Sequence, residues 1–147
     1  MKFMIRIKGE VGLDKDIFET LNRLKLKKKY AGVILNKETK EQMGMVLKAR
    51  NCIAYGEVSD DLLEKIISAR GRALDTSKKM SEPKKIIEGL KQGKELEDFN
   101  VKPFFRLHPP IGGFKAKGNV SPTKTHFPKG ALGDHGKELN KLLERMI

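Results

Sequence analysis

The residues best suited to catalysis or metal binding in this chain are few and widely spaced. Its histidines are His108, His126 and His135, and its one cysteine is Cys52. Zinc sites are usually built from close pairs of cysteine or histidine ligands, and the chain has no such pair. Cys52 lies in an apolar stretch, which favours a small buried side chain over a nucleophile. We therefore expect no metal site and no nucleophilic centre.

Carboxylate pairs and glycine-rich stretches also lack catalytic spacing. Asp60 and Asp61 stand at the expected start of a helix, where the helix dipole accounts for them. The stretches GEVG (9–12) and IGGFKAKG (111–118) contain no Gly-Lys-Ser/Thr sequence of a phosphate-binding loop. We expect no enzymatic activity, no cofactor and no small-molecule substrate.

Positive charge is the strongest functional signal. The 147 residues hold 31 Lys or Arg against 19 Asp or Glu, a net charge of +12. Residues 1–56 carry +7, residues 57–98 carry −1 and residues 99–147 carry +6. Thermostable proteins often mix lysine and glutamate on their surface, but such a mixture would not leave a net positive charge in both terminal segments of the chain. The division favours binding of a large anion, and nucleic acid is the commonest one in a cell.

The stretch FFRLHPPIGGFKAKGNVSPTKTHFPKGALGDHG, residues 104–136, is the first candidate binding surface. Its prolines stiffen an extended chain, and its glycines let the backbone lie close to a phosphate or base. Phe104 and Phe105 are expected to anchor it, whereas Phe114 and Phe127 either anchor it or stack on bases. A disordered tail is the alternative. The predicted nucleic-acid contacts are Arg106, His108, Gly112, Gly113, Lys115, Lys117, Lys124, His126 and Lys129.

The second candidate surface is a lysine run that follows an expected helix. It contains Lys25, Lys27, Lys28 and Lys29. Cations at a helix C-terminus complement its dipole, but four lysines in five positions exceed that requirement. We therefore predict a phosphate-binding corner here.

Three strands are expected to position these surfaces. Residues 2–8, 30–35 and 52–58 have strand composition. In the first of them, alternation places Phe3, Ile5 and Ile7 on a buried side, and Lys2, Arg6 and Lys8 on a basic outer side.

Helices are expected between and after these strands. Apolar residues at helical spacing predict one helix over about 15–25, with Asp14 as N-cap and Phe18 on its apolar face. A second begins at Asn36 or Thr39 and runs to about Lys48. Its expected buried side chains are Met43, Val46 and Leu47. A third, capped by Ser59, ends near Gly71.

The rest of the chain is less regular. Residues 71–80 are expected to be a polar linker and about 82–93 a short helix begun by Pro83. From Phe99, regular structure is expected to stop until a final amphipathic helix over 137–146. The chain is thus predicted to comprise an α/β nucleic-acid-binding core (1–70), a linker with a short helical addition (71–98), and an extended basic loop with a C-terminal helix (99–147).

The alternation of strands and helices predicts an α+β protein with helices packed on one face of a small sheet. No apolar run approaches the roughly 20 residues that span a bilayer. The first residues also lack the continuous apolar stretch of a signal peptide. We therefore expect a soluble, cytoplasmic protein without a membrane partner.

The sequence resembles the large-ribosomal-subunit protein family called L-thirty in archaea and bacteria. In length it is similar to the archaeal form, whose eukaryotic counterpart is called L-seven. The resemblance covers essentially the whole chain. It is carried by GMVLKARNCIAYGE at 44–57, FRLHPPIGGFK at 105–115, KTHFPKGALGDHG at 124–136 and LLERMI at 142–147.

The resemblance implies a β-α-β-α-β core with a three-stranded antiparallel sheet and both helices on one side. It also implies a structural constituent of the large ribosomal subunit that binds rRNA, with neighbouring large-subunit proteins as further partners. The family often has arginine where this chain has Met43 and Ile111. Nearby cations, Arg50 among them, would then supply the contacts. A regulatory RNA- or DNA-binding module acting outside the ribosome is the alternative.

Overall fold

Three antiparallel strands form the centre of the fold, β1 (Lys2–Arg6), β2 (Ala31–Leu35) and β3 (Ile53–Glu57). The computed structural model describes residues 1–36 and 38–147. β1 lies in the middle, where Met4 pairs with Val33 of β2 on one side and with Tyr55 of β3 on the other. All three strands were expected within a residue or two of these bounds.

Two short strands from the C-terminal part of the chain extend the sheet at both edges. β4 (Phe105–Arg106) pairs antiparallel with β2, and β5 (Gly133–Asp134) pairs parallel with β3. The sheet is therefore mixed, with the order β4-β2-β1-β3-β5, and the expected three-stranded antiparallel sheet is wrong in this detail. Strands of two residues are too short to show the alternation that reveals a strand in a sequence.

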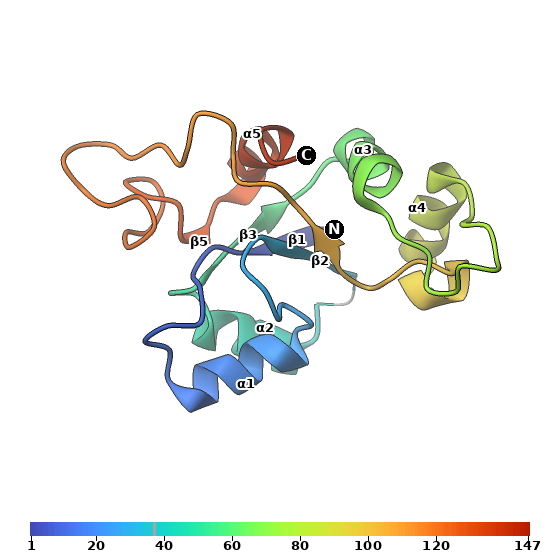
Figure 1. Ribbon diagram of the computed structural model, residues 1–147, viewed down its shortest axis with the longest axis horizontal. Coiled ribbons are helices and arrows are strands. Elements are labelled where there is room, and N and C mark those ends of the chain that lie inside the picture. Colours follow the sequence, from blue (N-terminus) through green and yellow to red (C-terminus); the bar gives the residue numbers. More distant parts are fainter. Residues whose placement is uncertain (37) are drawn as a thin grey trace.

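Two helices cover one face of the sheet, α1 (Lys15–Arg23) and α2 (Lys40–Lys48) (Figure 1). Their buried residues Leu21 and Val46 belong to the same apolar cluster as Met4. Thr39 caps α2, since its side chain accepts a hydrogen bond from the Gln42 amide at 3.2 Å.

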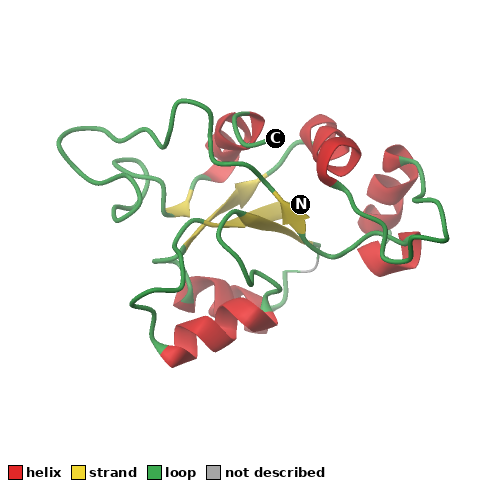
Figure 2. Cartoon of the chain, in the orientation of Figure 1, coloured by secondary structure: helices red, strands yellow, loops and turns green. Residues whose placement is uncertain are grey.

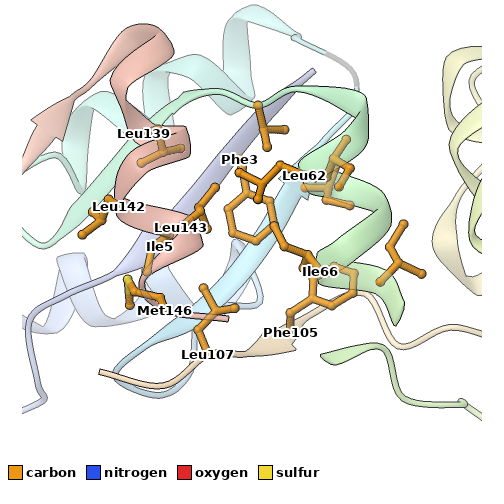
Figure 3. Close-up of a cluster of buried hydrophobic side chains, with 14 of the residues drawn as sticks. Phe3, Ile5, Leu62, Ile66, Phe105, Leu107, Leu139, Leu142, Leu143 and Met146 are labelled. Carbon is orange, nitrogen blue, oxygen red and sulfur yellow. The ribbon is translucent and has the colours of Figure 1, made fainter. Parts of the chain in front are cut away.

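The opposite face is covered by α3 (Asp60–Arg70) and α5 (Leu139–Glu144), with α4 (Pro83–Lys91) packed beside α3 (Figure 1). Figure 3 shows Phe3 and Ile5 of β1 among the side chains of these helices. The labelled members of this cluster are Phe3, Ile5, Leu62, Ile66, Phe105, Leu107, Leu139, Leu142, Leu143 and Met146. The expectation that helices lie on one face holds for α1 and α2 only. Successive residues of β1 point to opposite faces, so covering both faces buries the whole strand.

Three side chains differ from their expected exposure. Arg6 is fully buried, not part of a basic outer side, because the chain after α1 and the turn after β1 enclose its guanidinium. Leu47 is 53% exposed and Phe18 39% exposed, although both were expected on apolar helix faces. In α2 the inner side is taken by Val46, with Met43 and Met45 partly buried beside it.

The chain between β4 and β5 is a long irregular loop that projects from one end of the sheet (Figure 2). A 3-10 turn, Gly136–Glu138, leads from β5 into α5. The final helix was expected over 137–146, and the buried side chains Leu139, Leu142, Leu143 and Met146 confirm its amphipathic pattern. None of the helices in the described residues has the length and apolarity needed to cross a membrane.

Candidate nucleic-acid interface

The two basic segments of the sequence meet at one end of the sheet, where β1 ends and β2 and β3 begin (Figure 1). Arg106 pairs with Ala31, and the Leu107 amide donates to the Tyr30 carbonyl at 3.1 Å. The Phe114 ring stacks on the Tyr30 ring with centroids 6.3 Å apart. We call this region the basic end. Its cations are Lys27, Lys28, Lys29, Arg50, Arg106, Lys115, Lys117, Lys124 and Lys129.

A buried arginine supports the lysine corner from below. The Arg6 guanidinium donates to the carbonyls of Leu26 and Lys27, at 3.0 and 2.7 Å. It also donates to the carbonyls of Lys8 and Gly9, at 2.9 and 3.1 Å. Burial lowers the pKa of Arg6, but a guanidinium stays charged at neutral pH. Arg6 therefore joins the corner to the turn after β1.

The backbone that leads into the corner turns sharply. Lys25 has φ of 60°, and the Leu26 amide donates to the Leu21 carbonyl at 2.9 Å, which closes the end of α1. A left-handed conformation at a residue other than glycine costs about 1 kcal/mol, which the Arg6 contacts help to offset. The following residues Lys27, Lys28 and Lys29 are exposed.

Tyr30 connects the corner to the loop. Its backbone is also left-handed, with φ of 63°, and its amide donates to the Arg6 carbonyl at 2.7 Å. The Lys29 ammonium lies 5.0 Å from the centre of the Tyr30 ring, and Phe114 packs on the same ring. One side chain thus contacts both basic segments.

The turn Pro-Pro-Ile-Gly-Gly is held by Arg145, just beyond α5. Arg145 donates to the carbonyls of Ile111 and Gly113, and the Ile111 amide donates back to the Arg145 carbonyl at 2.9 Å. Gly112 and Gly113 have φ of 77° and 72°, so this turn favours glycine at both positions. The sequence offered only one signal for Arg145, the closing LLERMI stretch.

The second half of the loop is tied to the start of β3. The His126 ring shares a 2.8 Å hydrogen bond with the Asn51 side chain, next to Arg50. The Phe127 ring packs on His135 with centroids 4.6 Å apart, and His135 bonds to the Ala131 carbonyl at 2.8 Å. The contact between His126 and Asn51 brings this half of the loop, with Lys124 and Lys129, to the same end of the molecule as the corner.

None of the cations of the basic end forms an ion pair with another described residue. Among the predicted contacts Lys25 is different, because it pairs with Glu97 at 2.9 Å. The sequence between Asp98 and Asp134 contains no acidic residue at all. Five cations elsewhere in the described part of the chain are paired within the molecule: Lys2 with Glu38, Arg23 with Glu19, Lys48 with Asp16, Lys85 with Glu82 and Lys91 with Asp60.

The predicted site residues therefore have different roles. Lysines and arginines other than Lys25 remain free to bind an anion, and His108 is exposed beside them. The His126 side chain is already used inside the fold. Phe105 is fully buried and Phe104 partly buried, which confirms both as anchors. Arg6, Tyr30 and Arg145 position the surface and were not predicted to do so.

The groups considered for catalysis lie elsewhere or are buried. Cys52 is buried, and burial raises the pKa of its thiol, which disfavours the reactive thiolate. Burial lowers the pKa of His135. In residues 1–36 and 38–147 no three metal-ligating side chains gather into a cluster.

Comparison with known proteins identifies relatives along the whole chain. The sequence profile of the ribosomal protein L30p/L7e family matches residues 3–53. The chain is 35% identical to "Large ribosomal subunit protein uL30" of Archaeoglobus fulgidus, with 97% of each sequence covered. It is 36% identical to the protein of that name from Ignicoccus hospitalis, covering 98% of this chain and 96% of the relative. The protein of that name from Methanosphaera stadtmanae is 35% identical over all of both chains.

Proposed function

Because this chain belongs to the ribosomal protein L30p/L7e family, we propose that it is a structural constituent of the large ribosomal subunit that binds rRNA through its basic end. The family consists of ribosomal proteins and not of enzymes. The chain acts in the cytoplasm, as part of the ribosome. Its further partners are neighbouring proteins of the large subunit.

The observation that carries the rRNA proposal is the cluster of cations at the basic end, which have no ion-pair partner among the described residues. Lysines and arginines that bind phosphates displace the counterions around the nucleic acid, and this release drives binding. Phosphate contacts alone do not distinguish sequences, so the shape of the folded RNA supplies most of the specificity. The hydrogen bonds of Arg6 and Arg145 to backbone carbonyls support this role, because they hold the segments that carry the cations.

The three-part division of the chain fits the same proposal. The core of residues 1–70 supplies the lysine corner, and residues 99–147 supply the loop. Residues 71–98 carry almost no net charge and lie at the opposite end of the sheet (Figure 1). We propose that this segment faces a neighbouring protein instead of RNA.

Binding of the full chain to purified large-subunit rRNA tests the proposal. The affinity is measured between 50 and 200 mM salt, and hydroxyl-radical footprinting locates the protected backbone. We expect log affinity to fall steeply and linearly with log salt concentration. Binding that does not depend on salt would contradict the role of the basic end. A protein that dissociates from large subunits at moderate salt while binding other nucleic acids would instead be an extraribosomal module.

A further inference from the structure

A groove with a volume of about 450 Å³ lies between the loop and α5. Phe114 and Phe127 line it from two stretches of the loop, and Leu142 lines it from α5. Its volume is within the range of about 300 to 1,000 Å³ that is usual for small-molecule sites. Phosphate binding by exposed lysines needs no such groove.

Aromatic rings that line this groove are held in place by other rings. Phe114 packs on Tyr30, with centroids 6.3 Å apart and planes 29° apart. Phe127 packs on His135, with centroids 4.6 Å apart. Rings that are already fixed lose little freedom when a ligand stacks on them. The groove therefore presents prepared aromatic surfaces.

Cations surround these rings. Lys115, Lys117 and Lys141 line the groove, and Glu138 is the acidic residue among the lining side chains. Arg145 also lines it, but its guanidinium donates to the Ile111 and Gly113 carbonyls. The lysines are thus the cations left for a phosphate.

We infer that this groove takes one unpaired nucleobase of the bound RNA, with the base against the aromatic rings and its phosphate on the lysines. This inference rests on the proposed function. A base inside a duplex is stacked on its neighbours, so the groove selects a loop, a bulge or a strand end. An apolar peptide would match the rings but would leave the lysines without an anionic partner.

Replacement of the Phe127 ring by an aliphatic side chain tests the inference. Full-length wild-type and Phe127→Leu proteins are titrated with purified large-subunit rRNA at several salt concentrations. Stacking of one base contributes about 1 to 3 kcal/mol, so we expect a loss of about tenfold in affinity. The slope of log affinity against log salt stays unchanged, because no phosphate contact is removed. Phe127→Tyr restores the affinity.

The matched control is Phe18→Leu, because Phe18 is a partly exposed phenylalanine on α1, away from the loop. Thermal melting checks that each variant folds. Ultraviolet cross-linking of the wild-type complex gives an independent reading, since we expect a nucleotide adduct on the peptide that contains Phe114 or Phe127.

Two results would overturn the inference. One is that the folded Phe127→Leu protein binds rRNA as tightly as the wild type. If that variant also occupied fewer whole large subunits, the groove would be assigned to a segment of a neighbouring protein. The other is a set of adducts confined to Lys27–Lys29. In both cases the wild-type protein still binds rRNA. Failure of the wild-type protein to bind would refute the proposed function instead.

Discussion

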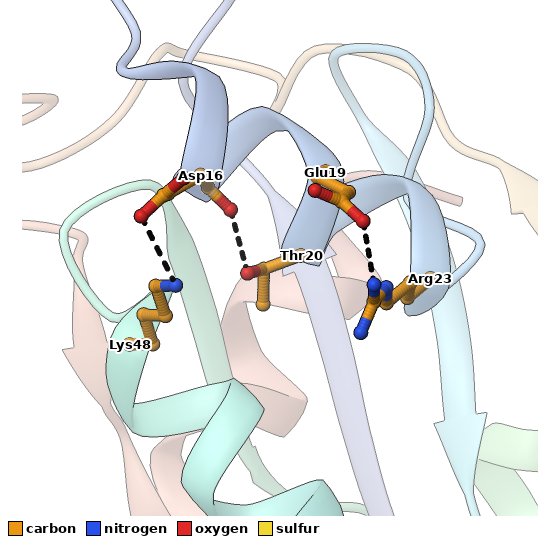
Figure 4. Close-up of polar contacts among 5 residues, drawn as sticks. All are labelled: Asp16, Glu19, Thr20, Arg23 and Lys48. Atoms are coloured by element: carbon orange, nitrogen blue, oxygen red, sulfur yellow. Dashed lines mark hydrogen bonds and ion pairs between the residues drawn. The ribbon is translucent and has the colours of Figure 1, made fainter.

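The two ends of the sheet differ in the partners of their cations. At the end where β1 begins, Lys2 pairs with Glu38, and nearby Lys91 of α4 pairs with Asp60 of α3. Along the α1–α2 face, Arg23 and Lys48 are paired as well (Figure 4). At the basic end, the cations from the corner and the loop have no such partners among the described residues.

This difference shows that cations at separate places in one molecule can have different roles, some pairing with carboxylates and others remaining available for binding. Exposed ion pairs contribute at most about 1 kcal/mol each, so their main effect here is to cancel charge locally. Cations without partners keep a positive field that extends about 8 Å at physiological salt. The nine cations of the basic end, with no acidic residue in the sequence between Asp98 and Asp134, therefore concentrate positive charge at that end of the fold.

The largest expected effect comes from removing the arginine beneath the corner. Arg6→Met leaves the carbonyls of Leu26, Lys27, Lys8 and Gly9 without their donor inside the protein. Buried polar groups without partners cost about 1 to 3 kcal/mol each, partly recovered by relaxation, so we expect a loss of about 3 kcal/mol in unfolding free energy. Chemical denaturation measures it. A loss below about 1 kcal/mol would show that the corner does not depend on Arg6.

Charge reversal of the corner should have the next largest effect. Replacing Lys27, Lys28 and Lys29 by Glu should weaken rRNA binding about a hundredfold and lower the salt slope by about 2 to 3. Incorporation into the large subunit should fall without unfolding, because these side chains are exposed.

The matched control for this variant reverses the same number of charges among paired cations, Arg23, Lys48 and Lys85. We expect a much smaller change in affinity from the control. Equal losses in both variants would mean that overall charge, and not its position, determines binding.

The loop should differ in protection with and without RNA. Hydrogen exchange of residues 106–130 should slow at least about tenfold when rRNA binds, since few amides in this segment belong to helices or strands. Amides of α3 serve as the internal control and should change little. Full protection of the loop in the free protein would disprove this prediction.

The smallest expected effect is a loss of folding stability at acidic pH. Burial lowers the pKa of His135, against the opposing effects of its Ala131 hydrogen bond and of Asp134 and Glu138. The unfolded chain, with an ordinary pKa of about 6.5, then binds a proton more readily than the folded one. Stability should thus fall as pH drops below about 6.5, by less than about 1.4 kcal/mol per pH unit. Chemical denaturation at pH 7.5 and 5.5 measures this loss of stability, which should be smaller for His135→Gln than for the wild-type protein. The same dependence in both proteins would exclude His135 as the cause.

Local patterns predicted the main elements well. Alternation in β1 and helical spacing in α3 and α5 placed each element within a few residues, because their apolar faces bury against the sheet. The positions of Leu47 and Phe18 were wrong, since each step of one residue along a helix turns the side chain by about 100°, which is enough to move it off the inner face. Arg6 was placed outside because a charged side chain in an alternating strand usually faces solvent.

The arrangement of the candidate interface was harder to predict. Lysine clusters and loop composition indicated both basic segments. The two segments lie side by side, however, because of Tyr30 and of a two-residue strand at Arg106. Such contacts join residues far apart in sequence, and no periodic pattern encodes them. The role of Arg145 is of the same kind, because it binds backbone carbonyls whose positions depend on the finished fold.

The contacts of Arg145 also have a consequence for the order of events during synthesis. The turn at Ile111–Gly113 leaves the peptide exit tunnel more than thirty residues before Arg145 does. The Leu139, Leu142 and Leu143 side chains that anchor the following helix also arrive late. Nascent chains must therefore carry an undocked, lysine-rich segment until these residues emerge. A pause in translation before residue 139 would lengthen the time in which that segment could bind the wrong polyanion.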